Sequence, residues 1–139
     1  MRITQESHYA LQIVTALASG EGVLDAKTLS ERTSVTQRFA LKILHKLVTA
    51  KIAVSFKGVK GGYSLKKKPE DITLRSIIEL IDGPIVIARC LGEDACSLNQ
   101  DKSSCIYHHI FEKISFNVAA FLDGITIADI LSGKNDFNF

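Results

Sequence analysis

The stretch from residue 25 to residue 65 constrains the fold most, because two short helical patterns are followed there by a β-rich, glycine-centred segment. Asp25 can cap a helix over residues 26–32, and Thr36 can cap a second helix that reaches about residue 50 and buries Phe39. Two helices joined by so short a connection are typical of a helix-turn-helix. The second helix is then expected to present its other side to a ligand.

The segment after these helices is predicted to be a β-hairpin. Residues 52–57 and 63–65 contain many β-forming side chains, and a glycine-dense tip at residues 58–62 separates them. Glycine permits positive φ and removes side chains that would hold a phosphate backbone away. Lys57 and Lys60 make the hairpin basic. A helix-turn-helix followed by a basic hairpin is a winged helix, and the combination is more specific than either part.

The charge of the chain is divided between its halves. Residues 1–68 carry 12 Lys and Arg against 4 Asp and Glu, a balance of +8, whereas residues 69–139 carry 5 against 11, a balance of −6. A basic half joined to an acidic half indicates that the first half meets a polyanion. The position of the positive residues on the winged helix favours double-stranded DNA as that polyanion.

Each part of the winged helix has an expected role on DNA. The start of the second helix would face base edges in the major groove, where Arg38 suits guanine and Gln37 suits adenine, while the lysines contact phosphates. Simple solvation is the alternative for Lys42, and the wing argues against it. The expected DNA-binding residues are Thr36, Gln37, Arg38, Phe39, Lys42, Lys57 and Lys60.

Further helical patterns lie on both sides of the winged helix. They cover residues 7–19, 74–82 after the cap Thr73, 105–122 with Ser103 or Ser104 as cap, and 126–131. The longest has an apolar face too wide for a helix packed on one side only, so we expect a partner chain to cover the rest of it. That face contains Ile106, Ile110, Ile114, Val118 and Phe121, and is broadened by Tyr107, Phe111 and Leu122.

Composition excludes several classes of protein. No apolar stretch approaches the roughly 20 residues that a membrane span needs, and the first residues lack a secretory apolar region, so we expect a cytoplasmic protein without a membrane partner. An enzyme with a Cys nucleophile is disfavoured, because no Cys follows a strand–turn–helix elbow or a glycine-rich pocket. An adaptor that binds protein through its winged helix is a further alternative.

The three cysteines of the chain form one constellation with a histidine, Cys90-x5-Cys96-x8-Cys105-x2-His108. A structural zinc site normally has at least one pair of Cys two to four residues apart, and that pair is absent. Gaps of five and eight residues suit a broader ligand, such as an iron–sulfur cluster held by thiolates. Cys105 and His108 are three residues apart at a helix start and therefore share a face. Simple packing of small apolar side chains is the alternative for the cysteines.

The order of these motifs resembles the IscR-type branch of the Rrf2 family of bacterial transcription regulators. The resemblance runs from residue 1 to about residue 131, and its most specific parts are the wing Lys57-Gly58-Val59-Lys60-Gly61-Gly62-Tyr63 and the three-Cys spacing. The opening Met1-Arg2-Ile3-Thr4 and the later Ile81-Asp82-Gly83 are also similar. The resemblance implies a homodimer, paired through the long helix, that binds palindromic promoter DNA and senses through an iron–sulfur cluster.

The resemblance also implies a ligand set. Cys90, Cys96 and Cys105 match the three cluster thiolates, and His108 matches the imidazole ligand of the two-iron members, which favours a 2Fe-2S cluster. The gap before Cys105 is nearer to that of the nitric-oxide-sensing branch, whose 4Fe-4S cluster takes its fourth ligand from the first helix of the other subunit. His8 occupies that position here. Both ligands stay open, with His108 favoured because its proximity to Cys105 costs no loop closure.

The sequence as a whole predicts a mainly α-helical protein with a small β-hairpin. Residues 1–68 form a winged-helix DNA-binding region, and residues 69–139 form a cluster-binding loop and a long C-terminal dimerisation helix, within one continuous unit. The expected function is a transcriptional repressor that senses iron–sulfur cluster, redox or nitric-oxide status, with cluster-assembly proteins as further partners. The alternative is a cluster-free winged-helix regulator that senses by thiol oxidation or zinc. Leu41 stands where some IscR-type proteins carry an acidic specificity residue, so their operator sequence is not transferred.

Overall fold

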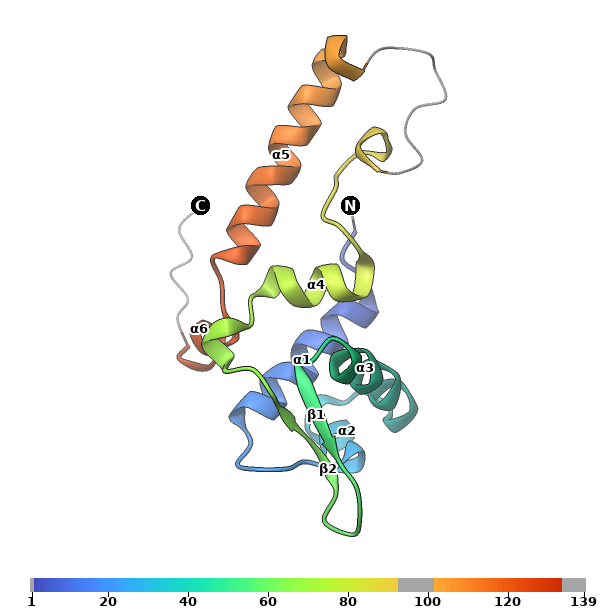
Figure 1. The fold of residues 1–139 in the computed structure, drawn as a ribbon, viewed down its shortest axis with the longest axis vertical. Helices are drawn as coiled ribbons and strands as arrows, with labels where there is room; N and C mark the ends of the chain where they lie inside the picture. Colours follow the sequence, from blue (N-terminus) through green and yellow to red (C-terminus); the bar gives the residue numbers. More distant parts are fainter. Residues whose placement is uncertain (1, 93–101, 134–139) are drawn as a thin grey trace.

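A computed structural model describes residues 2–92 and 102–133 of the 139-residue chain. The winged helix lies at one end of an elongated molecule, and the longest helix projects from the other end (Figure 1). The helices are α1 (Gln5–Ser19), α2 (Ala26–Thr33), α3 (Gln37–Thr49), α4 (Leu74–Asp82), α5 (Ile106–Asp123) and α6 (Ile127–Leu131). Strands β1 (Ala53–Phe56) and β2 (Gly62–Leu65) form the hairpin, and η1 (Pro69–Asp71), η2 (Arg89–Leu91) and η3 (Lys102–Ser104) are single 3-10 turns.

The helix-turn-helix is present as predicted. The side chain of Asp25 accepts a hydrogen bond from the backbone N–H of Thr28 at 2.7 Å, and Thr36 caps α3 through the N–H of Phe39. Apolar side chains spaced by three and four residues on α1 and α3 meet between these helices and form the core. Fully buried side chains of this core include Ile13, Val14, Leu29, Val35, Ile43, Leu44 and Leu47.

Phe39 departs from its predicted burial. Its side chain is 40% exposed, because the buried stripe of α3 runs through Ala40, Ile43 and Leu44 and leaves Phe39 at the edge of the first turn. The ring packs edge-on against Tyr9 of α1, with 5.9 Å between ring centroids. Phe39 therefore joins the core to the exposed side of α3.

The hairpin pairs β1 and β2 in antiparallel register, with Ala53 opposite Leu65 and Phe56 opposite Gly62. Strand β2 is fixed to the connection between α1 and α2, because Leu24 and Tyr63 exchange two backbone hydrogen bonds of 2.9 and 2.8 Å. A Cβ atom added to Gly62 would lie 2.5 Å from the carbonyl oxygen of Leu24. This close approach explains why the position is a glycine.

The C-terminal half of the chain returns to the same core. Ile72, Ile77 and Ile127 are fully buried among residues of α1 and α3. The backbone N–H of Leu74 donates to the carbonyl of Ile125, and the N–H of Ile127 donates to the carbonyl of Ile72, both at 2.9 Å. Helices α4 and α6 are held against α1 in this way, and α5 leaves the body of the molecule between them (Figure 1).

Helix α5 buries little of its own surface against this chain. Ser115 and Ala119 are its buried residues, and Ala119 packs with Ile78 and Ile85 in a second, smaller apolar cluster. The predicted caps Ser103 and Ser104 are not at the cap position, because α5 begins one residue later and its N-cap is Cys105, which makes no capping hydrogen bond. Within residues 2–92 and 102–133, no helix has the length and apolar content needed to cross a bilayer.

Candidate DNA-binding face and cysteine site

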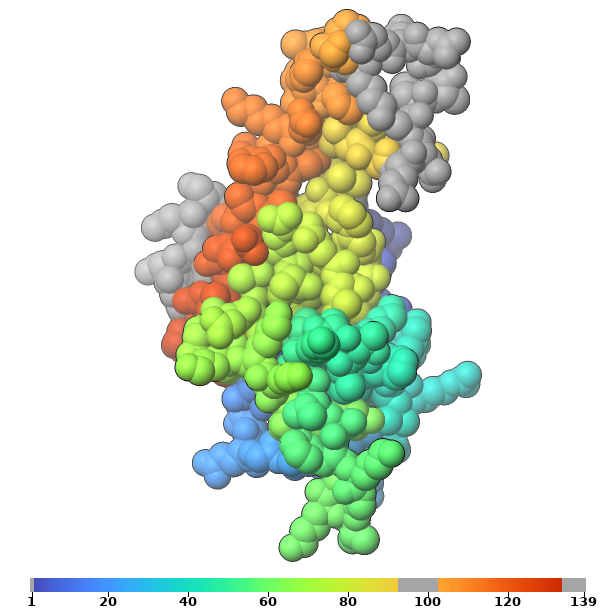
Figure 2. Space-filling model, in the orientation of Figure 1, coloured from blue at the N-terminus to red at the C-terminus, as the bar shows by residue number. Residues whose placement is uncertain are grey.

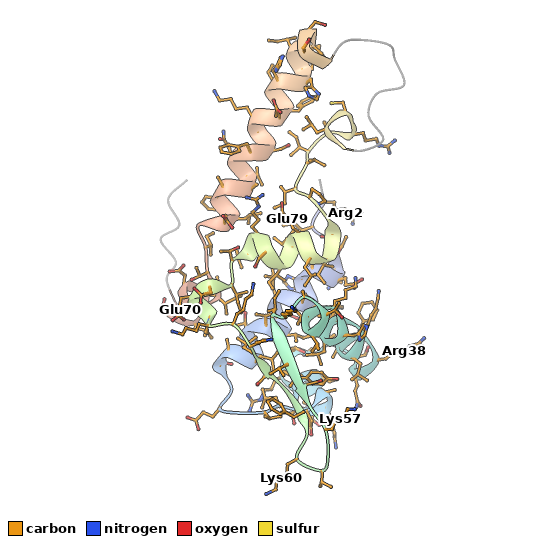
Figure 3. All side chains as sticks on the ribbon, in the orientation of Figure 1. Arg2, Arg38, Lys57, Lys60, Glu70 and Glu79 are labelled. Atoms are coloured by element: carbon orange, nitrogen blue, oxygen red, sulfur yellow. The ribbon has the colours of Figure 1, made fainter. Side chains whose placement is uncertain are left out.

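The start of α3 presents polar side chains to solvent. Thr36, Gln37 and Arg38 are all exposed, and Arg38 extends away from the body of the molecule (Figure 3). Leu41, one turn further on, is 43% exposed. A helix start that carries an extended guanidinium and an amide can reach base edges in a major groove.

The wing places further cations at the same end of the molecule. Lys57 follows β1 and Lys60 lies at the tip, and both are exposed (Figure 3). The hairpin protrudes as a narrow projection whose surface continues into that of α3 on the face shown in Figure 2. Val59 beside Lys60 is fully exposed, so none of the described residues covers the tip. The residues predicted to contact DNA thus lie at one end of the folded molecule.

Two lysines of α3 are ion-paired rather than merely solvated. The ammonium groups of Lys42 and Lys46 lie 2.9 and 2.6 Å from the carboxylate oxygens of Glu6, on the first turn of α1. Lys42 also lies over the ring of Phe39, 5.5 Å from its centroid. Hydrogen bonds from Lys46 and then Lys42 lower the pKa of Glu6 from its ordinary value. No local pattern in the sequence indicates this role of Glu6, because 36 and 40 residues separate it from its partners.

The N-terminus of α1 is tied to the end of α4. The carboxylate of Asp82 accepts hydrogen bonds from the backbone N–H and hydroxyl of Thr4, at 3.0 and 2.5 Å, and from the hydroxyl of Ser7 at 2.7 Å. Burial raises the pKa of Asp82, but the hydrogen bonds from Thr4 and Ser7 outweigh it and leave the pKa lowered. Thr4 is also the N-cap of α1, so this contact fixes where the helix begins, two residues before the predicted start.

The described cysteines lie at the opposite end from the wing. Cys90 is on η2 and Cys105 immediately precedes α5, and both are half-buried free thiols. Turn η2 packs beside α5, and the N–H of Ile87 just before it donates to the hydroxyl of Ser115 at 3.0 Å (Figure 1). The fold therefore brings the Cys90 segment alongside the helix that Cys105 begins. Cys96 lies outside the described residues.

The two histidines of α5 differ in their surroundings. Nδ1 of His108 is buried and has no hydrogen-bond partner among the described residues. His109 is exposed, and its Nε2 donates to the carbonyl oxygen of Ser103 at 2.9 Å. A buried imidazole nitrogen without a partner, one turn after Cys105, fits the donor that the predicted cluster needs.

His8 is on a different element from these residues. It is exposed on α1, and the amide nitrogen of Gln12 lies 3.3 Å from its Nε2. It lines a groove of about 730 Å³ together with Leu11, Leu74 and Ile130. Among residues 2–92 and 102–133, no three His, Cys, Asp or Glu side chains gather closely enough to hold a metal ion. The described part of the chain therefore does not bring His8 together with both Cys90 and Cys105.

An exposed helix-turn-helix with a basic wing defines a winged-helix DNA-binding protein. The model of the Rrf2 family, described as iron-dependent transcriptional regulators, matches residues 3–133. The chain belongs to this family, and is a transcriptional regulator.

Several relatives match almost the whole chain. An rrf2-like HTH-type transcriptional regulator of Rhodobacter capsulatus is 30% identical, over 96% of this chain and 94% of the relative. The HTH-type transcriptional regulator IscR of Aliivibrio salmonicida is 28% identical, over 94% of this chain and 77% of the relative.

Solved structures share the fold. IscR of T. potens is 26% identical with a TM-score of 0.77, over 100% of this chain and 92% of that chain. CymR, described as the global cysteine regulator of B. subtilis, is 24% identical with a TM-score of 0.78, over 97% of this chain and 99% of that one. The similarity to CymR concerns the fold alone.

Proposed function

We propose that the protein is a homodimeric repressor that binds palindromic promoter DNA and senses through an iron–sulfur cluster. Cys90, Cys96 and Cys105 would hold the cluster, with His108 as the fourth ligand. The observation that carries the proposal is the buried Nδ1 of His108, which has no hydrogen-bond partner among the described residues and lies one turn after Cys105. The relatives named IscR and the family description add support.

The chain's own residues would turn ligand binding into a conformational constraint. A bound cluster supplies one-electron chemistry and reactivity toward oxidants or nitric oxide. Cys90 reaches the site through η2, which packs on α5, and the Ile87–Ser115 hydrogen bond fixes the approach of that segment. Thiolates on both sides of this contact would clamp the segment to α5, and loss of the ligand would release it.

The proposed dimer follows from the surface that α5 leaves open. Ile106, Tyr107 and Phe116 are 65%, 67% and 71% exposed, and Ile110 and Ile114 add to the apolar area. Exposed apolar surface of this size on one helix is typical of a protein interface. A second copy that covers α5 would place the two α3 helices of the dimer side by side, to match DNA half-sites about 34 Å apart. A change of a few ångströms in their separation would change the affinity for DNA.

The decisive experiment is anaerobic purification, with iron and sulfide counts and an absorption spectrum. Wild type is expected to contain iron and sulfide, Cys96→Ala to lose them, and His108→Ala to lose them or change spectrum. His109→Ala is the matched control, because His109 is adjacent but exposed, and it should match wild type. If His8→Ala changes the spectrum and His108→Ala does not, the fourth ligand is His8 of the partner copy.

The same preparations test the sensing step. DNA binding by the holo and cluster-free proteins should differ, and equal affinities for every operator tried would refute the switch. A colourless, iron-free protein from strictly anaerobic cells would overturn the cluster. That result would favour the cluster-free alternative, in which the protein senses by zinc or thiol oxidation. Zinc content and DNA binding after peroxide treatment would test it.

A further inference from the structure

Two lysines of α3, the helix expected to contact DNA bases, share one counter-ion within the protein. Lys42 and Lys46 stand one turn apart on α3, and both ammonium groups bind the carboxylate of Glu6, at 2.9 and 2.6 Å. The Lys42 side chain is 56% exposed and that of Lys46 33%, whereas the Glu6 side chain is only 19% exposed. The lysines can thus leave the contact easily, while the carboxylate is confined.

The position of Glu6 is fixed by the start of α1. Glu6 lies in the first turn, where a negative charge is favoured by the helix dipole. Thr4 and Ser7, on either side of it in sequence, bind Asp82 at the end of α4. These contacts hold the backbone on both sides of Glu6, and its carboxylate offers two oxygens to α3.

A phosphate of DNA offers the same kind of partner to a lysine. Each lysine that neutralises a phosphate releases a counterion, which contributes to affinity and to its dependence on salt. A lysine already paired with a carboxylate brings less positive charge to the DNA. We propose that Glu6 is a built-in competitor of DNA phosphates, which holds Lys42 and Lys46 in the free protein and weakens DNA binding until they exchange partners.

A role in folding alone does not account for this arrangement. Ion pairs this exposed stabilise folded proteins little, because solvent screens them and ordering the side chains costs entropy. Their effect on the binding of a polyanion is larger, because the DNA surface carries a dense negative charge. Glu6 would thus change the affinity for DNA more than it changes the stability of the fold. This inference rests on the proposed function only in taking DNA as the ligand.

The test is a salt titration of DNA binding by Glu6→Gln. At low salt the variant is expected to bind a fixed duplex about three- to ten-fold more tightly per protomer, from two released surface pairs. The slope of log affinity against log salt should steepen by up to about one unit for each lysine released. Glu79→Gln is the control, because it removes the same charge and an ion pair of 3.1 Å with Arg75, away from α3.

A second comparison separates competition from other causes. In a Lys42→Gln/Lys46→Gln background, Glu6→Gln should leave affinity and salt slope unchanged, because no lysine remains to be released. Unchanged or weaker binding by Glu6→Gln in the wild-type background, with native thermal unfolding, would overturn the inference. Absence of DNA binding by wild type in every cluster state would instead refute the proposed function, so the two failures are distinguishable.

Discussion

The backbone N–H of Ile87 donates a 3.0 Å hydrogen bond to the hydroxyl of Ser115, and this hydroxyl in turn donates to the carbonyl of Phe111. Ser115 is 6% exposed and is one of the two buried polar residues among those described. The contact joins the segment that leads to Cys90 to the middle of α5.

Ser115→Ala is expected to loosen the cysteine site. The substitution leaves the Ile87 N–H without its partner, and an unsatisfied group in a partly buried place costs about 1–3 kcal/mol. We expect a lower denaturation midpoint and faster loss of iron from the purified holoprotein. Glu112→Gln, at an exposed position of α5 outside the stripe of Ile106, Ile110 and Ile114, is the control and should leave both unchanged. Iron retention equal to wild type would show that this contact does not hold the Cys90 segment.

Acid should destabilise the protein through Glu6 and Asp82. Both carboxyls have a pKa lowered in the folded protein, so their stabilising contribution is present above the ordinary values of 4.5 and 3.8. It is lost as the pH falls through the lowered folded-state values, because the unfolded chain then binds more protons. The free energy of unfolding, measured by urea titration from pH 6 downward, should fall in this range.

Two variants assign the acid effect. Glu6→Gln and Asp82→Asn should each flatten the pH dependence of stability, whereas Asp71→Asn, on the exposed η1 turn, should not. If the double variant Glu6→Gln/Asp82→Asn shows the same pH dependence of stability as the wild type, the acid sensitivity comes from other groups.

Gly62→Ala should displace the wing. The added methyl group would meet the carbonyl of Leu24 at 2.5 Å and break the exchange of hydrogen bonds between Leu24 and Tyr63. We expect a loss of stability of more than about 1 kcal/mol and weaker DNA binding. Gly58→Ala tests backbone strain alone, because Gly58 has a φ of +103° but nothing within 4 Å of an added Cβ. Equal effects of the two substitutions would argue against the clash.

Arg38 and Lys60 should differ in what they contribute to DNA binding. Arg38→Ala is expected to cost about 1–3 kcal/mol on the preferred operator and little on unrelated sequences, because a guanidinium at the helix start reads a base. Lys60→Ala should weaken binding to all sequences alike and reduce the salt slope by about one unit. Competition binding with operator and random duplexes measures both effects. If Lys60→Ala affected only the operator and Arg38→Ala affected all sequences, the two roles would be exchanged.

Local signals made much of the fold predictable. Asp25, Thr36 and Thr73 cap their helices as expected, because a cap is recognised from a few neighbouring residues. The hairpin follows from two β-rich runs around a glycine-dense turn. The exposed side of α3 follows from helical periodicity.

Contacts between distant residues were beyond such signals. Thr4 and Asp82 are 78 residues apart, and either could equally have faced solvent. The pairing of Glu6 with Lys46 depends on how α1 crosses α3, which periodicity does not specify. Phe39 was misplaced for a similar reason, since a residue at the edge of an apolar stripe is buried or exposed according to its neighbour Tyr9. The proposed cluster ligands come from the sequence, and the burial of Nδ1 of His108 supports one of them.

The projection of α5 gives this chain a long lever arm. Its 18 residues correspond to about 27 Å of helix, with Cys105 at the free end and Ala119 near the pivot. A rotation of about 5° at the pivot therefore carries the tip through roughly 2 Å. Spectroscopic labels near the tip would therefore detect small rotations at the pivot. Conversely, a displacement of about 2 Å at the Cys105 end would reach the pivot only as a tilt of a few degrees.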